Sequence, residues 1–343
     1  MLSIVKIKNA IANAFDIFGI IDRRISNKSK SGYLILMYHR IFQNTGFCKS
    51  LQAGMYVEPE TFEMHIRYLK QRFDVVSLSE MFSSVHDKER SRSTGPVCAL
   101  TFDDGWQDFF KFAFPVLMRN QVPATVFLPT GYIGTSDWFW TDRLGRIMAT
   151  GIQRVEPGGR GSPSDNPLTE RITRLHGPFE KRLETAISIL KEREEREIEE
   201  VIAELQERGD IRPAPLERNF LNWEEVREMR SSGQVSFGSH THNHRILIHL
   251  KEEEVRSELD LSKQILLREG VVDSSFIPFC YPNGASNQRI AGMVREAGYH
   301  LAVSTGAGWN EKNASPFALN RVPIHQDMTA SREMFGCRVA EIL

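Results

Sequence analysis

The sequence predicts an α/β fold in which short parallel strands alternate with helices that cover them. Three observations support this class. Short apolar runs recur along most of the chain and alternate with stretches of helical periodicity, which is the pattern of parallel β-α units. The 343 residues, of which 41% are hydrophobic, are enough to bury a large core. Polar residues follow directly after several apolar runs, where the strand ends of α/β enzymes carry their chemistry.

The first expected element is an amphipathic helix within residues 1–30. Apolar residues recur there at roughly helical spacing, interrupted by Lys6, Lys8 and Asp16. This pattern favours a helix that packs on the domain, with a membrane-surface helix as the alternative, because both need an apolar face. The charges argue against a bilayer span, and the segment lacks the apolar centre and cleavage site of a secretory signal. We therefore expect a cytoplasmic protein, with the inner face of the membrane as the alternative location.

Six short runs are expected to form the sheet, and the helices between them should cover it. Each run is apolar and bounded by turn-forming residues. Residues 59–72 and 252–269 carry apolar side chains at helical spacing. The six runs are 33–38, 97–102, 124–129, 235–238, 276–281 and 300–305.

The alternation is interrupted at about 135–221, where we expect an insertion. Gly, Ser and Pro are dense in 157–167, which indicates a loop. Residues 181–208 combine many charged residues with apolar residues at helical spacing, and this predicts one long helix with a solvated face. The core pattern resumes at Asn222, which can begin the next helix in a capping box with Glu225.

Charge and cysteine usage exclude two classes of protein. Lys and Arg number 43 against 44 Asp and Glu, so the net charge of -1 creates no field that attracts nucleic acid. The four cysteines are far apart and form no C-x-x-C pair, which favours reduced thiols over a disulfide framework. They are Cys48, Cys98, Cys280 and Cys337.

Two acidic residues stand directly after the predicted strand at 97–102. On an extended backbone Asp103 and Asp104 would point in opposite directions, but Gly105 allows a turn that brings both to the strand mouth. One acid could then bind a metal ion while the other stays free. Taken alone, an Asp-Asp-Gly run is also a common turn.

A cluster of imidazoles follows the predicted strand at 235–238. His240 and His244 are four residues apart and would share one helical face, which would turn His242 away as a structural residue. The glutamate of the H-E-x-x-H zinc-protease helix is missing. Two imidazoles and one carboxylate leave coordination positions open for water and substrate, as hydrolytic zinc sites require. The two clusters together predict a metal-dependent hydrolase.

These motifs resemble those of the polysaccharide deacetylases of carbohydrate esterase family 4, the NodB-homology domain. Thr-Phe-Asp-Asp-Gly at 101–105 looks like the first motif of that family, and His-Thr-His-Asn-His at 240–244 looks like the second. Further similar segments are Leu-Met-Tyr-His-Arg at 36–40, Phe-Cys-Tyr-Pro-Asn-Gly at 279–284 and Asn-Arg-Val-Pro at 320–323.

The resemblance implies a fold and a mechanism. It runs from about Tyr33 to Ile324 and implies a distorted (β/α) barrel with fewer strands than the eight-stranded form, within a catalytic domain at 31–343. The family's motifs imply one divalent ion, Zn²⁺ first, with Co²⁺, Ni²⁺ or Fe²⁺ as alternatives. Asp103 becomes the general base for the attacking water, while the metal polarises the acetamide carbonyl. The implied metal ligands are Asp104, His240 and His244.

The chain departs from the family's pattern in two places. Members often carry an arginine in the third motif that orients the catalytic aspartate, but Cys280 stands there. We expect Arg321 to replace it by pairing bidentately with Asp103, with a structural salt bridge as the alternative. The family's late histidine, a general acid, has no clean counterpart, and His325 is the nearest.

Several residues are expected to bind substrate at the same mouth. The turn that contains Tyr281 and Asn283 is expected on the oxyanion side, with an ordinary Pro-Asn-Gly turn as the alternative. His39 follows the first strand and is expected to contact substrate or water, or else to be structural. Trp309 and Trp140 are candidates for stacking on a sugar ring, with core packing as the alternative.

The sequence therefore predicts metal-dependent removal of an N-acetyl group from an N-acetylhexosamine in a polysaccharide or a lipid-linked glycan precursor. The alternatives are a deformylase or other non-peptide C-N hydrolase acting on a sugar, and a catalytically impaired carbohydrate-binding protein. A retaining glycosidase fits poorly, because adjacent residues cannot readily place two carboxyls about 5 Å apart across a sugar. The expected partners are the carbohydrate and, through the first helix, the membrane surface.

Overall fold

The chain forms two compact units in the computed structural model, which describes residues 2–43, 54–86, 95–150, 166–208 and 218–342. Each unit has a hydrophobic core of its own. The first unit comprises Met1–Phe42, Tyr56–Thr135 and Phe220–Leu343, and the second comprises Gln43–Met55 and Ser136–Asn219.

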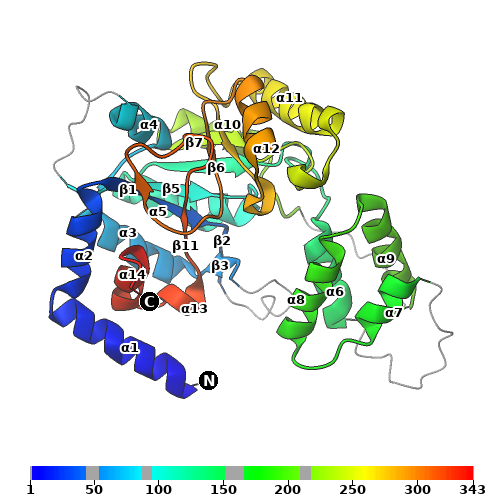
Figure 1. The fold of residues 1–343 in the computed structure, drawn as a ribbon, viewed down its shortest axis with the longest axis horizontal. Coiled ribbons are helices and arrows are strands. Elements are labelled where there is room, and N and C mark those ends of the chain that lie inside the picture. Colours follow the sequence, from blue (N-terminus) through cyan, green and yellow to red (C-terminus); the bar gives the residue numbers. More distant parts are fainter. Residues whose placement is uncertain (1, 44–53, 87–94, 151–165, 209–217, 343) are drawn as a thin grey trace. The chain divides into compact units, whose positions relative to one another are not determined.

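A curled, mostly parallel sheet forms the centre of the first unit (Figure 1). Its strands run in the order β10-β1-β5-β6-β7-β8-β9, with β11 also paired to β1 and β4 to β5. All six predicted strands are confirmed, and only β10 is antiparallel to its neighbour. The strands are β1 (Gly32–Tyr38), β4 (Asp74–Val75), β5 (Val97–Phe102), β6 (Ala124–Leu128), β7 (Val235–Ser239), β8 (Pro278–Cys280), β9 (Leu301–Val303), β10 (Asn310–Glu311) and β11 (Val322–Pro323), and β2 (Arg40–Ile41) pairs separately with β3 (Tyr56–Val57).

One segment lies across the gap between the first and last parallel strands of the sheet. Leu319 pairs with Val303 of β9, and three residues later Val322 pairs with Leu36 of β1. The sheet therefore curls toward a closed barrel without forming eight regular strands, which agrees with the distorted (β/α) barrel expected from the sequence. Arg321 lies in this segment, so the topology brings it to the barrel interior.

The helices that cover the sheet begin and end close to their predicted bounds. In α3 (Pro59–Arg72), a proline opens the helix and the predicted apolar face is buried. At the start of α10 (Trp223–Ser231), the Asn222 side chain accepts the N-H of Glu225 and the Glu225 carboxylate accepts the N-H of Asn222, so the predicted capping box is confirmed. The other helices of this layer are α4 (Leu78–His86), α5 (Phe114–Asn120), α11 (Glu252–Arg268), α12 (Gln288–Glu296), α13 (Gln326–Thr329) and α14 (Arg332–Val339).

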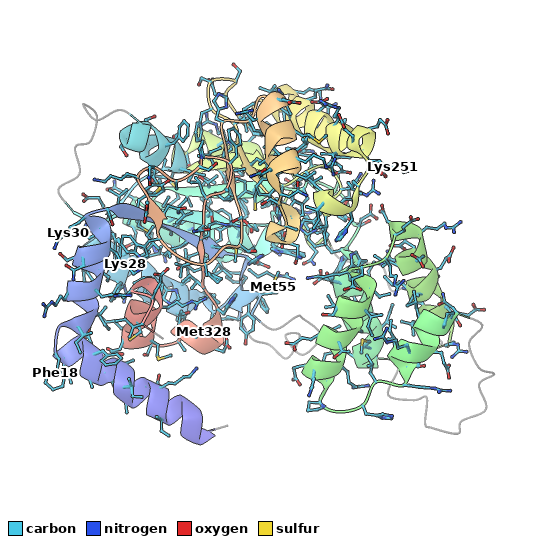
Figure 2. All side chains as sticks on the ribbon, viewed as in Figure 1. Phe18, Lys28, Lys30, Met55, Lys251 and Met328 are labelled. Atoms are coloured by element: carbon cyan, nitrogen blue, oxygen red, sulfur yellow. The ribbon has the colours of Figure 1, made fainter. Side chains whose placement is uncertain are left out.

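The N-terminal segment forms two helices instead of the single one expected. α1 (Leu2–Ile17) and α2 (Ile20–Ser29) are separated at Gly19, whose φ of 65° lies in the left-handed region that favours glycine. α1 packs against α14, and Phe18 projects outward at the corner between α1 and α2 (Figure 2). Among the described residues, none of the helices has the length and apolar character that crossing a bilayer requires.

The second unit is helical. The prediction of one long helix at 181–208 is wrong, because the structure has two helices there. The chain turns at 191–194 between α8 (Phe179–Leu190) and α9 (Glu195–Arg208), because the apolar faces of both helices then reach one core. The other helices of this unit are α6 (Trp140–Thr150) and α7 (Pro167–Thr173). Most of the loop predicted at 157–167 lies outside the described residues, as does Cys48.

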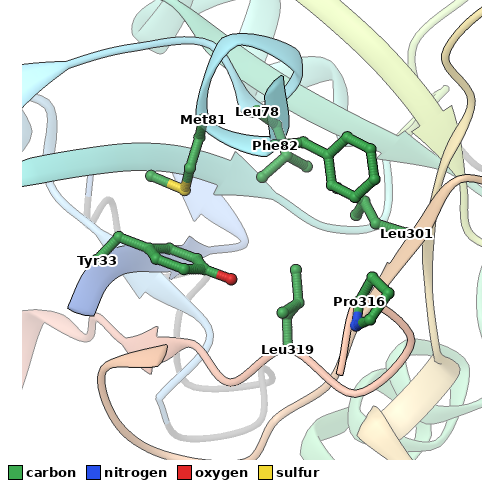
Figure 3. A pocket seen from close by; sticks show the side chains of 7 residues that line it. All are labelled: Tyr33, Leu78, Met81, Phe82, Leu301, Pro316 and Leu319. Carbon is green, nitrogen blue, oxygen red and sulfur yellow. The ribbon is translucent and has the colours of Figure 1, made fainter. Parts of the chain in front are cut away.

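A small apolar cavity lies near the amino-terminal end of the sheet (Figure 3). Its lining includes Tyr33 near the start of β1, Leu301 at the start of β9 and Met81 of α4. Apart from the Tyr33 hydroxyl its lining is apolar, and it contains no histidine, cysteine or carboxylate that could bind a metal. The chemistry of the molecule must therefore be sought at the opposite end of the strands.

Candidate active site

The predicted catalytic residues gather at the carboxyl end of the parallel sheet. Asp103 and Asp104 follow β5, His240 follows β7, Cys280 ends β8 and Arg321 precedes β11. Parallel strands bring these positions to one edge, which is where α/β proteins hold their ligands.

Asp104, His240 and His244 lie close enough together to share one ion. The Oδ1 atom of Asp104 is 3.3 Å from Nε2 of each histidine, and one ligand atom from each residue lies within 4.8 Å of the others. Donors about 2 Å from a tetrahedral ion would stand roughly 3.3 Å apart. The residues therefore fit a divalent ion, and two imidazoles with one carboxylate suit Zn²⁺, Co²⁺, Ni²⁺ or Fe²⁺.

The turn after β5 separates the two aspartates. Asp104 has a φ of 74° and Gly105 a φ of 64°, so two successive left-handed residues redirect the chain. Aspartate tolerates this conformation better than most residues with a side chain. The predicted turn is present, and it begins one residue earlier than Gly105, at Asp104 itself.

The histidine motif is a loop, so the expectation that His240 and His244 share a helical face is wrong. Thr241 and His244 have φ values of 65° and 57°, and these left-handed residues fold the loop back toward Asp104. His240 is anchored separately, because its Nδ1-H donates to the carbonyl oxygen of Cys280 at 2.8 Å and leaves Nε2 facing Asp104. His242 turns away and its Nδ1 lies 3.0 Å from the Thr130 hydroxyl, which is a structural contact as expected.

Arg321 pairs bidentately with Asp103, so the contact expected between them is present. Its Nη1 and Nη2 atoms donate to the two carboxylate oxygens, each at 2.7 Å. The guanidinium is fully buried, and its other N-H groups reach the Thr101 hydroxyl, the Ser304 carbonyl and the Cys280 sulfur. The charge that the third motif lacks at Cys280 is thus delivered to the same place from another segment.

The environment keeps both carboxylates ionised. Burial alone would raise the pKa of Asp103, but the charge and hydrogen bonds of Arg321 outweigh it and hold that pKa below its ordinary value. Burial likewise opposes ionisation of Asp104, and hydrogen bonds from His240 and His244 hold its pKa well below the usual range. Asp103 is therefore neutralised by a protein cation, whereas Asp104 faces two potential metal ligands.

A second group of possible ligands shares His240 but is less suited to an ion. Atoms of Asp103, His240 and Cys280 also lie within 4.8 Å of one another. Arg321 donates to both Asp103 and Cys280, so a metal cation there would meet a fixed positive charge at contact distance. Burial also raises the pKa of the Cys280 thiol, which disfavours the thiolate form that binds metal.

His39 also lies close to Asp103, the predicted base. Its Nε2 lies 3.8 Å from Oδ2 of Asp103, and its side chain is 15% exposed. His325 follows β11, which runs parallel to β1, so its backbone reaches the same edge of the sheet. The His325 carbonyl oxygen accepts the Thr329 hydroxyl within α13.

Tyr281, one of the two residues after β8 that were expected to contact substrate, is instead buried. The Tyr281 side chain is buried in the core and its hydroxyl donates to the Phe317 carbonyl at 2.9 Å, while its N-H donates to Val303. Tyr281 therefore has neither its hydroxyl nor its N-H available to an oxyanion. Asn283 is exposed in the same turn with a φ of 56° and stays a candidate.

The two tryptophans that were expected to stack on a sugar ring pack against the protein itself. Trp309 adjoins β10, which pairs with the amino-terminal end of β1, and its indole N-H donates to the Val339 carbonyl at 2.8 Å. It therefore lies at the wrong end of the strands for a substrate contact. Trp140 packs partly buried against the core of the second unit.

Trp106 holds the carboxylate of Asp104 by a hydrogen bond. This role was not predicted from the sequence, although Trp106 directly follows Asp-Asp-Gly. Its indole N-H donates at 3.0 Å to Oδ2 of Asp104, the oxygen not shared with the histidines. The ring stacks on Phe220, with 4.6 Å between centroids, and the Arg40 guanidinium lies 4.4 Å from its centroid. Arg40 in turn pairs with buried Asp108. Both oxygens of Asp104 are thus fixed in direction.

Comparisons with known sequences show the family to which the chain belongs. A family model described as polysaccharide deacetylase matches residues 90–156 and 176–302. The putative polysaccharide deacetylase YxkH of Bacillus subtilis is 20% identical over 297 residues, which cover 87% of this chain and 73% of that protein. The poly-beta-1,6-N-acetyl-D-glucosamine N-deacetylase of Staphylococcus aureus is 26% identical over 148 residues, covering 39% of this chain and half of that protein.

Solved structures share the fold. The Streptococcus pyogenes deacetylase PplD in complex with acetate has a TM-score of 0.57 and 20% identity, covering 87% of this chain and 94% of its own. IcaB from Ammonifex degensii has a TM-score of 0.55 and 17% identity, covering 89% and 97%. At these identities the likeness establishes the architecture.

Replacing Arg321 with methionine should move the acidic limb of the pH-rate profile to higher pH. Asp103 stays buried in this variant, and without the cation its pKa rises, so the carboxylate is lost at a higher pH than in the wild type. Steady-state rates measured across the acidic range test this. A variant that loses thermal stability while its limb stays in place would show that Arg321 is only structural.

Proposed function

Because the chain belongs to the polysaccharide deacetylase family, we propose that it removes N-acetyl groups from N-acetylhexosamine residues with the help of one divalent metal ion. The observation that carries this proposal is the different surroundings of two neighbouring carboxylates. Asp104 faces His240 and His244, whereas Asp103 is held by Arg321. Ion binding and proton transfer are thereby assigned to separate residues.

The residues support hydrolysis of an amide. An ion held by Asp104, His240 and His244 would polarise the acetamide carbonyl and stabilise the negative charge that develops on its oxygen. Asp103 is ionised beside this position and accepts a proton from the attacking water. Arg321 uses one lone pair on each oxygen of Asp103, so further lone pairs stay available for that proton.

We assign protonation of the leaving amine to His39 in preference to His325. An amine leaves an amide carbon only after its nitrogen gains a proton, and a positioned histidine can supply that proton. His39 is partly exposed at the site mouth and lies 3.8 Å from the carboxylate of Asp103. It can therefore meet both the base and the substrate nitrogen.

The proposed substrate is a polysaccharide that contains N-acetylglucosamine. The Staphylococcus aureus relative carries the name of such a substrate, and the match to it covers 39% of this chain. A lipid-linked precursor presents the same acetamide group and is the second form we propose. A binding protein without turnover loses support, because Arg321 supplies the charge that Cys280 lacks.

Purified protein should release acetate from N-acetylglucosamine oligosaccharides, lose this activity with a chelator and regain it with added Zn²⁺ or Co²⁺. Asp103→Asn should bind the ion as the wild type does but release acetate at least about 100-fold more slowly, because an amide cannot accept the proton. Asp260→Asn, on the exposed side of α11, serves as the matched control and should keep full activity. Chelator-insensitive acetate release would contradict the proposed metal dependence.

The two candidate acids can be separated by substitution. We expect His39→Gln to reduce turnover by about 100-fold, since glutamine cannot protonate the leaving amine. His325→Gln should change turnover by less than about 3-fold. The reverse pattern, measured as kcat across pH, would move the role to His325.

We also propose that α1 contacts an anionic membrane surface. Ile7 is 58% exposed and Phe18 is 77% exposed, and Ile11 is also exposed. At about 100° per residue these three positions fall within roughly 40° of one another, on the side of α1 opposite Asp16, which pairs with Arg332 of α14. The face that packs on the protein and the exposed apolar face are therefore different.

Exposed cations in the following helix suit anionic lipid. Arg23 and Arg24 of α2 are exposed. The neighbouring acid, Asp22, pairs with Arg72. An apolar face flanked by cations is the pattern of helices that lie in the membrane interface. The location predicted at the inner face of the membrane stays a prediction.

Vesicle sedimentation tests this contact. The wild type should sediment with vesicles of phosphatidylserine and phosphatidylcholine, and a variant with Ile7, Ile11 and Phe18 changed to serine should not, because it lacks the inserting side chains. Both proteins should act equally on soluble oligosaccharide. Equal sedimentation of the two proteins, or a dimer in the wild type that the variant loses, would reject lipid as the occupant of this face.

A further inference from the structure

Glu258 is a buried carboxylate that the proposed reaction does not use. It lies on α11 and is 4% exposed. Its Oε2 accepts the backbone N-H groups of His242 and Asn243 at 2.9 and 2.8 Å, and its Oε1 accepts the Asn243 side-chain amide at 3.0 Å. A buried charge is tolerated only where hydrogen bonds compensate its lost hydration. All three of these donors belong to the histidine loop, 240–244.

The same loop is held from its other side by the segment after β6. The N-H of Thr130 donates to the Thr241 carbonyl at 3.2 Å, and the N-H of Gly131 donates to the His242 carbonyl at 2.8 Å. A side chain on Gly131 would lie 2.9 Å from that carbonyl oxygen, so the approach requires glycine. The histidine loop is thus fixed between the end of β6 and the side chain of Glu258.

The loop needs such support because of its backbone. Thr241 and His244 both adopt left-handed conformations, which residues with side chains rarely take without a compensating environment. His244 directly follows the two residues whose N-H groups Glu258 accepts. Its Nε2 reaches to 3.3 Å from Oδ1 of Asp104 only in this conformation of the loop.

The two histidines differ in how they are anchored. The side chain of His240 is nearly inaccessible and bonds directly to the Cys280 carbonyl. The side chain of His244 is 26% exposed, and its backbone directly follows the two N-H groups that Glu258 accepts. Loss of the support at Glu258 would therefore displace His244 first.

We propose that Glu258 is a positioning residue for the metal centre, which fixes the histidine loop so that His244 faces Asp104. This inference rests on the proposed metal site. Glu258 touches neither the ion nor the substrate. Its removal should weaken metal binding while the rest of the fold stays intact, as is found for residues that orient metal ligands.

Two substitutions of Glu258 should weaken metal binding to different extents. Glu258→Leu removes every acceptor, and we expect its affinity for Zn²⁺ to fall by about 10- to 100-fold. Glu258→Gln keeps one oxygen that can accept the backbone N-H groups, so its affinity should lie between those of the leucine variant and the wild type. Glu253→Leu, on an exposed position of the same helix, is the matched control and should bind as the wild type does.

The readouts are metal-competition titration of the metal-free full-length protein, the visible spectrum of its Co²⁺ form and circular dichroism. An altered Co²⁺ spectrum together with weaker binding and native circular dichroism supports the proposal, since a purely structural role would leave the spectrum of the bound ion unchanged. Unchanged affinity and spectrum in the glutamine and leucine variants overturn it. If the leucine variant does not fold, the glutamine variant decides by the same criteria. A wild type that binds no ion would instead overturn the proposed function.

Discussion

The bidentate pairing of Arg321 with Asp103 is the contact on which the rest of the site depends. It joins the end of β5 to the segment that connects β9 and β1. The N-H groups of Arg321 donate to both carboxylate oxygens of Asp103, to the Thr101 hydroxyl and to the Ser304 carbonyl. Without a cation, burial would favour the protonated form of Asp103. With it, Asp103 is ionised and already paired, which is why the proposed ion-binding role is assigned to Asp104.

Arg321 places its positive charge beside both Cys280 and Asp103. Cys280 has a short side chain, and its sulfur lies 3.2 Å from Nη2 of Arg321, in the space beside Asp103 that a longer residue at 280 would enter. The Cys280 carbonyl, at the end of β8, also anchors His240. The end of β8 thus leaves room for Arg321 and orients His240, which links the position of Asp103 to that of His240.

Much of this arrangement could be read from the sequence, and the failures have specific causes. The six strands were predictable because each is a buried apolar run, and the pairing of Arg321 followed from the gap at Cys280. The loop conformation of His240 and His244 was not, because left-handed Thr241 and His244 give no glycine signal. Glu258 acts through hydrogen bonds between separate segments, which leave no local pattern in the sequence. Trp106 is only two residues from Asp104, but the sequence does not show that its indole N-H points back to that carboxylate. Nor does it show that the Tyr281 hydroxyl is bonded to the Phe317 carbonyl or that Trp309 lies near the amino-terminal end of β1.

The division of labour between the two aspartates is tested most directly by anomalous diffraction from crystals of the Zn²⁺-loaded protein, recorded at the zinc absorption edge. The account predicts one peak about 2 Å from the Asp104 carboxylate and from Nε2 of His240 and His244. Asp103 should stay paired with Arg321 in the same crystals. A peak between Asp103, His240 and Cys280, with Arg321 displaced, would contradict the account.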